Sequence, residues 1–334
     1  MNTNLNKDVM NNIFYFSLKV LRKLYAKSFG TVLENPICVI DPDEASKLIY
    51  NALNADEPCM IARFGSTELN CLTNYLGIVN DKGKYFDYIK GNATAWWWNP
   101  KVISQMSTHS GFFPPTVEKI EQFCELMLQD IPAVDILGSW RPEEKLLEKE
   151  LKNAHKINLL LLEPYWAENH WSRVLEGKKV LVVHPFAEDI EQQYLKRGLL
   201  FKKNILPQFE LTTIKSVQSL AGEKVGFKDW FEALDYMKAE IDKVDYDICL
   251  IGCGAYGFHL AAHVKRSGKK GFHYGGALQL LFGIKGKRWE NELFGKDELG
   301  EKGKYPALFN EHWIYPGDKS RPKNANAIEG ACYW

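Results

Sequence analysis

Two kinds of apolar pattern alternate along this chain. Short, almost uninterrupted apolar runs, such as KVLVV at 179–183 and DICLI at 247–251, are separated by longer segments in which apolar residues recur every three or four positions. Continuous apolar runs are typical of strands in a parallel sheet that helices cover on both faces. The sequence predicts seven strands, at 58–64, 133–138, 156–162, 178–184, 210–217, 246–252 and 270–274.

The segments between these runs carry the helical spacing. Strands and helices in alternation are typical of wound α/β domains. No internal repeat and no linker rich in Pro or Gly divides the pattern. The sequence therefore predicts an α/β fold with a Rossmann-like, doubly wound and mostly parallel sheet, in a single domain at 37–334. We expect its helices at 69–76, 115–129, 142–153, 187–195, 228–242, 255–267 and 278–283.

The two ends of the chain depart from this pattern. Residues 1–36 form a predicted helical extension, in which 13–29 combine apolar side chains with four basic ones and no acidic one. Such a basic amphipathic helix can lie on an anionic membrane surface, or it can dock on its own domain or on a partner subunit of a homo-oligomer. From about residue 286 the chain becomes irregular and aromatic, and we expect this tail to fold back over the sheet. The rings of the tail are Trp289, Trp313, Tyr315, Tyr333 and Trp334.

Composition narrows the class of protein. Of 334 residues 46% are hydrophobic, which is enough for a large core. The 42 basic and 42 acidic residues balance, which argues against nucleic acid as a main partner. Seven cysteines, an odd number without C-x-x-C spacing, are typical of a reducing compartment. With no secretory signal pattern and no apolar run of about 18 residues, we expect a cytoplasmic protein. If 13–29 bind a membrane rather than protein, they would contact its inner face.

The first candidate for chemistry is RFGSTE at 63–68, which follows a predicted strand and opens a helix. Open α/β sheets bind ligands at this end of their strands. Arg63 is suited to a diphosphate through its planar fork of donors, and Gly65 would let the backbone approach the ligand. Glu68 would face a metal or a sugar hydroxyl. The alternative is an ordinary turn, in which Ser66 or Thr67 caps the helix and Glu68 complements its dipole.

Two glycine turns follow later strands. Gly252, Gly254 and Gly257 have the G-x-G-x-x-G spacing that binds phosphates between a strand and a helix. The chain lacks the acidic residue about 20 positions on that a dinucleotide site requires, so we expect no NAD. Gly275 and Gly276 form the next turn, and the two turns together would line one crevice with free backbone amides. Alternatively, these glycines only permit close packing of helix on strand.

Basic and aromatic side chains near these turns could help to bind a ligand in the crevice. Lys285, Lys287 and Arg288 would add positive charge to the crevice, or they form a solvated basic loop. Flat rings stack on sugars or nucleobases, although they also fill ordinary cores. Candidates for such stacking are Trp96, Trp97, Trp98, Trp140 and Trp166.

A fourth candidate follows the strand at 178–184. His184, with Glu188 and Asp189 in the next helical turn, could deprotonate the hydroxyl of an acceptor. Alternatively, the two carboxylates complement the start of a helix while His184 fills a polar niche. We favour the functional interpretation because His184 would lie at the same sheet edge as the glycine turns.

The segment IARFGSTE at 61–68 resembles the R-F-G-D-G-E segment of bacterial glycosyltransferases with the GT-D fold. LIGCGAYG at 250–257 and GGALQLLFG at 275–283 look like the glycine-rich region of related proteins. The resemblance covers about residues 40–290 in order and type, and its first motif is the specific one. It implies a Rossmann-like sheet, a nucleotide-sugar donor and a divalent metal, Mn²⁺ or Mg²⁺, near an Asp-x-Glu pair that here retains Glu68.

Ser66 stands where that family has the aspartate. A hydroxyl is a far weaker ligand for a hard cation, so Arg63 and the turn amides are the alternative partners of the diphosphate. The resemblance implies transfer of a sugar from a nucleoside diphosphate sugar, such as a UDP-sugar, to a hydroxyl of a glycan or lipid-linked oligosaccharide in surface polysaccharide biosynthesis. The alternative is a non-catalytic nucleotide- or glycan-binding protein of polysaccharide assembly.

Overall fold

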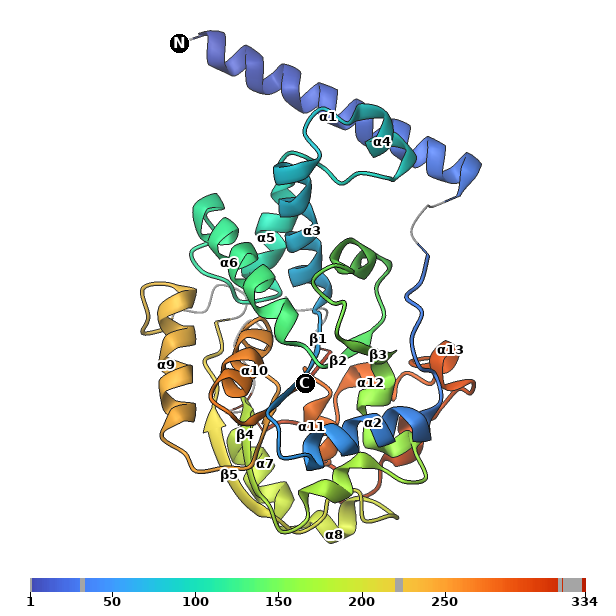
Figure 1. Ribbon diagram of the computed structural model, residues 1–334, viewed down its shortest axis with the longest axis vertical. Helices are drawn as coiled ribbons and strands as arrows, with labels where there is room; N and C mark the ends of the chain where they lie inside the picture. The colour runs from blue at the N-terminus through green and yellow to red at the C-terminus, as the bar shows by residue number, and fades with distance from the viewer. Residues whose placement is uncertain (1, 31–33, 220–224, 318–319, 321–331) are drawn as a thin grey trace.

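The computed structural model describes residues 2–30, 34–219, 225–317, 320 and 332–334, with side chains from residue 13 onward. Within this part of the chain the centre is one seven-stranded sheet with the order β3-β2-β1-β7-β6-β4-β5. Every pair of neighbours in this sheet is parallel. The strands are β1 Cys59–Arg63, β2 Ile136–Ser139, β3 His155–Asn158, β4 Lys179–His184, β5 Glu210–Lys215, β6 Ile248–Ile251 and β7 Lys270–His273 (Figure 1).

The observed strands confirm all seven predicted ones, although most of their bounds differ from the expected ones by one to four residues. The third strand ends at Asn158, whose side chain accepts the Leu160 N–H and starts a 3-10 turn. The helix expected at 142–153 is instead the 3-10 helix Pro142–Leu147. Its Glu144 is buried and accepts the backbone N–H groups of Trp140 and Arg141 at 3.0 Å, which pulls the segment into tighter turns.

Helices surround the sheet. Several begin at a residue whose side chain accepts a hydrogen bond from the first turn, as Asp229 does from the Glu232 N–H at 2.9 Å. The α-helices are α1 Asn2–Phe29, α2 Pro42–Asn54, α3 Ser66–Asn80, α4 Tyr85–Lys90, α5 Pro100–Thr108, α6 Val117–Asp130, α7 Ala187–Tyr194, α8 Arg197–Leu200, α9 Trp230–Asp242, α10 Tyr256–Arg266, α11 Leu278–Leu281, α12 Lys287–Glu290 and α13 Lys296–Leu299.

The sheet is covered on both faces. Alternate strand residues point to opposite sides, so Ala62 and Ile251 join one apolar core with α3, α6, α9 and α10. Ile61 and Leu250 join the other core with α2, α7 and α11. This arrangement is the predicted doubly wound α/β architecture.

The chain leaves the neighbouring strands β1 and β7 on opposite faces of the sheet. These strands are neighbours, with Met60 opposite Gly271. The chain leaves β1 into α3 on one face, whereas it leaves β7 into α11 on the other face. The connections diverge above the sheet, which opens a crevice at the carboxyl ends of the two strands.

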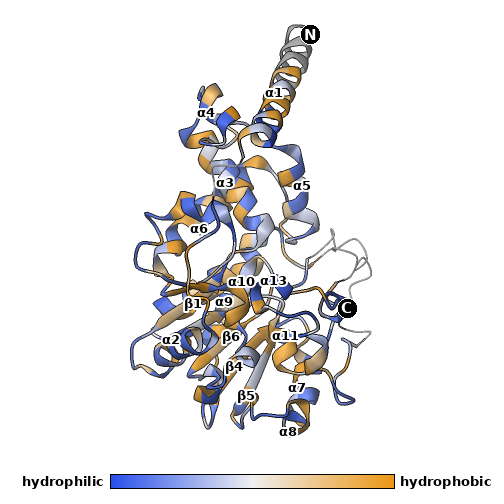
Figure 2. Ribbon diagram, turned by 90° about the vertical axis from the view of Figure 1, so that its right-hand side faces the viewer, coloured by the Kyte–Doolittle hydropathy of each residue, from blue (hydrophilic) through white to orange (hydrophobic). Residues whose placement is uncertain are grey.

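The ends of the chain differ in how they pack. α1 projects from the body and lies across α4 (Figures 1 and 2). In the tail, Trp289, Trp313 and Trp334 belong to a core of the sheet, so its described residues fold back as expected. Residues 318–319 and 321–331 of the tail, and 1 and 31–33 of the extension, lie outside the described residues. Within the described helices, none has both the length and the apolar content needed to cross a membrane.

Candidate functional site

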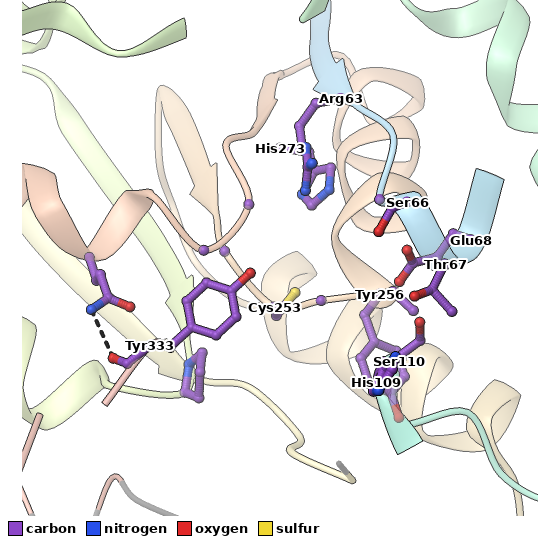
Figure 3. A pocket seen from close by; sticks show the side chains of 18 of the residues that line it. Arg63, Ser66, Thr67, Glu68, His109, Ser110, Cys253, Tyr256, His273 and Tyr333 are labelled. Carbon is purple, nitrogen blue, oxygen red and sulfur yellow. Dashed lines mark hydrogen bonds between the residues drawn. The ribbon is translucent and has the colours of Figure 1, made fainter. Parts of the chain in front are cut away.

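A cavity of about 710 Å³ lies at the carboxyl ends of the central strands. Ligand pockets for small molecules typically range from about 300 to 1,000 Å³. Residues that end or follow five strands line it (Figure 3). These are Arg63 from β1, His184 from β4, Ser216 after β5, Gly252 after β6 and His273 from β7.

Arg63 lies directly against the turn that follows β7. A Cβ placed on Gly275 would lie 3.2 Å from the Arg63 Cδ and 3.3 Å from its Nη1. The guanidinium also lies over the Trp140 ring, 5.5 Å from the centroid. The structure thus brings Arg63 together with the glycine turns: Gly252, Gly254, Gly275 and Gly276 line the same cavity.

Two of these glycines supply space rather than the predicted free amides. The Gly252 N–H donates to the Val183 carbonyl at 2.9 Å, and the Gly275 N–H donates to the Ile251 carbonyl at 3.3 Å. A Cβ on Gly252 would lie 2.8 Å from the Gly275 carbonyl oxygen. The bare Cα of Gly252 therefore allows the turns after β6 and β7 to touch.

The RFGSTE segment forms one wall. Gly65 is the N-cap of α3, and the Glu68 carboxylate folds back against the Gly65 Cα, so that a side chain at residue 65 would collide with it. Figure 3 shows Ser66, Thr67 and Glu68 together at the start of α3. The start of α10 also borders the cavity. Two helix N-termini at one cavity favour a bound anion.

Charges on the wall favour an anion as well. Arg63, Lys287 and Arg288 line the cavity, whereas Lys285 lies over the Tyr315 ring. Glu68 provides the only side-chain carboxylate among the described lining residues.

A resident divalent metal does not fit this set of side chains. Across the described residues, no group of three His, Cys, Asp or Glu side chains could hold a metal ion. Beside Glu68 the wall offers the hydroxyls of Ser66 and Thr67, and Mn²⁺ and Mg²⁺ require stronger oxygen ligands. The local chemistry therefore gives no ligand set for the metal that the family resemblance implies.

His184 lines the cavity as a neutral ring. Its Nδ1 accepts the Phe186 N–H at 3.0 Å, so the ring carries its proton on Nε2. Burial lowers the pKa of His184 to about 3. A neutral imidazole with a low pKa and one nitrogen already used is better suited to donate a hydrogen bond than to accept a proton.

Three other predicted site residues lie outside the cavity lining. Glu188 is exposed and pairs with Lys215, with 3.2 Å between Oε1 and Nζ. Asp189 accepts hydrogen bonds from the Ser320 hydroxyl at 2.5 Å and the Gly317 N–H at 3.2 Å, so it holds the tail. Gly257 leaves room for the His273 ring. In the structure these residues serve packing and the attachment of the tail.

Sequence reasoning missed several polar residues of the wall. Ser110 Oγ, Ser216 Oγ and His273 Nδ1 are buried and have no hydrogen-bond partner among the residues that the structure describes. Buried polar atoms ordinarily find a partner in protein, water or ligand. Ser216 lies near the end of the strand predicted at 210–217, so its position at the strand end is a signal that could have identified it. Ser110 comes from the loop after α5, for which the sequence gives no signal.

Aromatic rings form two sides of the cavity. Trp140 is oriented by its Nε1–H, which donates to the Phe64 carbonyl at 3.2 Å. Tyr333 lies across the cavity from α3 (Figure 3), and the Arg288 guanidinium lies 4.8 Å from its ring centroid. The other tryptophans considered from the sequence do not line the cavity. Trp97, for example, stacks on Tyr15 of α1.

A smaller cavity of about 70 Å³ adjoins the first and shares Arg63, Gly276 and Arg288 with it. Glu163 lines this cavity and is buried. Its Oε2 accepts hydrogen bonds from the Tyr305 hydroxyl at 2.7 Å and the Trp166 Nε1–H at 3.1 Å. Burial outweighs these bonds and raises the pKa of Glu163 to about 8.

This raised pKa predicts a stability that falls as the pH rises. Between about 4.5 and 8 the unfolded Glu163 has lost its proton while the folded one keeps it. The free energy of unfolding should therefore fall by up to about 1.4 kcal/mol per pH unit in this window, with no further loss above it. Urea unfolding across the window should show a shallower decline for Glu163→Gln.

Glu143→Gln is the matched control for this experiment. Glu143 pairs with Arg141 and is partly exposed, so the substitution should leave the slope unchanged. Equal slopes for the unmodified protein and Glu163→Gln would show that Glu163 ionises in the folded protein as it does in the unfolded chain.

Comparisons of this chain with protein-family models, curated proteins and solved structures give no match. The resemblance to GT-D glycosyltransferases therefore stays a prediction from the motif at 61–68. The cavity and its lining residues are therefore the basis for a proposed function.

Proposed function

We propose that this protein is a glycosyltransferase that uses a nucleoside diphosphate sugar, such as a UDP-sugar, and transfers the sugar to a hydroxyl of a glycan or a lipid-linked oligosaccharide. One observation carries the proposal: Arg63 and the turns that follow β6 and β7 line a single cavity, whose described lining has three cationic side chains, Arg63 included, and one carboxylate. A diphosphate matches this charge, and Trp140 and Tyr333 offer flat surfaces for a base or sugar.

The reaction explains why the cations are needed. The acceptor oxygen bonds to the anomeric carbon, the bond from that carbon to the phosphate oxygen breaks, and the diphosphate leaves with the electron pair. Negative charge grows on the diphosphate, and preplaced donors stabilise it. We assign this role to Arg63 and to the N-termini of α3 and α10, with Lys287 and Arg288 on the same wall. These groups take the place of a metal in the proposal.

The acceptor hydroxyl must lose a proton in this reaction. His184 is a weak base because its pKa is about 3, and Glu188 and Asp189 lie outside the cavity lining. Glu68 is the side-chain carboxylate at the described wall, so we assign the proton to it.

A specific observation also favours a second candidate, a non-catalytic nucleotide- or glycan-binding protein of polysaccharide assembly. The described wall holds one carboxylate, and the buried His184 and His273 both have pKa values near 3. Such a cavity can bind an anion, and it leaves Glu68 as the one candidate proton acceptor of the described wall.

Titration of the full chain with UDP, UMP and uridine, followed by incubation with a panel of nucleotide sugars, separates these candidates. We expect UDP to bind at least about tenfold more tightly than uridine, because the cations contact phosphates. We also expect release of UDP from one donor, with and without a metal chelator. Binding without release would favour the second candidate, and equal affinity for UDP and uridine would contradict the role assigned to Arg63, Lys287 and Arg288 as partners of the diphosphate.

A further inference from the structure

The described side chains of α1, from residue 13 onward, attach it to the protein along one side. Tyr15 stacks on Trp97 with 4.2 Å between ring centroids. Leu18 is buried, and the Arg22 Nη1 donates to the Ala93 carbonyl at 2.9 Å. Positions 15, 18 and 22 recur every three or four residues, so they define one face of the helix. This face holds α1 against α4 and the segment that follows it.

The opposite face of α1 is apolar and exposed. Ile13 is 62% exposed, Phe16 67%, Val20 39% and Leu24 57%. These four residues, which we call the outer stripe, recur at helical spacing and point away from the attached face. Figure 2 shows hydrophobic residues along α1 where it projects from the body. Contiguous apolar surface of this kind marks an interaction site.

Charge identifies the occupant of this surface. No acidic residue occurs from Val9 to Leu33, while the exposed Lys23 lies at the edge of the outer stripe and the exposed Lys27 continues it toward the end of α1. In a coiled coil with a second copy, the heptad that begins at Ile13 and Phe16 would place these two lysines in the seam, where like charges repel. On a lipid surface the same lysines would meet lipid phosphates.

We propose that α1 is an interfacial helix that binds an anionic lipid bilayer. It lies in the plane of the surface with the outer stripe among the acyl chains and with Lys23 and Lys27 at the phosphates. The proposal is independent of the function assigned to the cavity.

Sedimentation of the full chain with vesicles tests this proposal. We expect binding to vesicles of phosphatidylcholine mixed with phosphatidylglycerol, weaker binding to phosphatidylcholine alone, and loss of the difference at high salt. The double variant Phe16→Ser/Leu24→Ser should lower the partition coefficient at least about tenfold, because two buried apolar side chains are lost. Lys23→Gln/Lys27→Gln should lower it about tenfold or more on the mixed vesicles only.

The control is Leu195→Ser/Leu293→Ser, which changes two apolar residues outside α1 that are 75% and 63% exposed. We expect this variant to bind vesicles like the unmodified protein. Equal binding by all variants would overturn the proposal, as would no binding at all. A lipid-free dimer that Phe16→Ser/Leu24→Ser converts to monomer, measured by sedimentation velocity, would instead assign the outer stripe to a second copy.

Discussion

Substitution of Arg63 by alanine should weaken binding of UDP about 10- to 100-fold, because a guanidinium that contacts a diphosphate contributes charge-assisted hydrogen bonds of about 1.5–3 kcal/mol. Turnover of the nucleotide sugar should fall further, by about 100- to 1,000-fold, since charge on the leaving diphosphate grows in the transition state. Calorimetry gives the affinity, and release of UDP gives the rate. Arg63→Lys keeps the charge and loses the planar fork of donors, so its UDP affinity and its turnover should lie between those of Arg63→Ala and the unmodified protein.

Arg141 provides a matched control. Its guanidinium lies 5.3 Å from the centroid of the same Trp140 ring, but it pairs with Glu143 at 2.9 Å and does not line the cavity. Arg141→Ala should leave both UDP affinity and turnover unchanged. If Arg63→Ala folds and binds UDP as the unmodified protein does, the diphosphate lies elsewhere and the proposed function loses its central residue.

Substitution of Glu68 by glutamine should separate binding from turnover. Loss of the carboxylate removes the proton acceptor, and we expect release of UDP to slow about 100- to 10,000-fold. UDP affinity should stay the same or rise, because the cavity loses its one negative side chain among the described lining residues. Both quantities are measured as for Arg63, with and without Mn²⁺.

The direction of the affinity change also tests the role of the metal. If Glu68 held Mn²⁺, Glu68→Gln would weaken UDP binding only when manganese is present. Glu143→Gln is a suitable control, since it removes a carboxylate outside the cavity lining. If Glu68→Gln leaves turnover unchanged, a group other than Glu68 accepts the proton.

The motif behind the family resemblance predicts the position of a site in the sequence but not the direction of its side chains. The resemblance predicted a site at 61–68. In the structure this segment spans the carboxyl end of β1 and the start of α3, and its residues Arg63 to Glu68 line a cavity. The resemblance also implied a metal, and Ser66 was the sequence signal against that. The structure adds that Glu68 folds back on Gly65 at the start of α3. A motif fixes the order of side chains, whereas their direction depends on the turn that carries them.

The position of a residue at the end of a predicted strand was sufficient to place it at the cavity where only the direction of the backbone matters. Arg63, His184, Gly252 and Gly275 each end or follow a strand, and parallel strands bring such residues to one edge. The same reasoning placed Asp189 wrongly. Asp189 lies in the next helical turn, and its carboxylate accepts hydrogen bonds from Gly317 and Ser320 of the tail. Asp189 is distant in the sequence from Gly317 and Ser320, and no local pattern indicates that they are in contact.

The sequence by itself determined the seven strands, the doubly wound class and the basic apolar helix at the N-terminus, because apolar periodicity is a local property that each segment carries alone. Only the tertiary structure decided that β1 and β7 are neighbours, that Arg63 contacts the turn at Gly275, and that burial keeps His184 neutral. Strand pairing, cavity shape and the pKa of a buried group arise from contacts between residues far apart in the chain, so no local pattern specifies them.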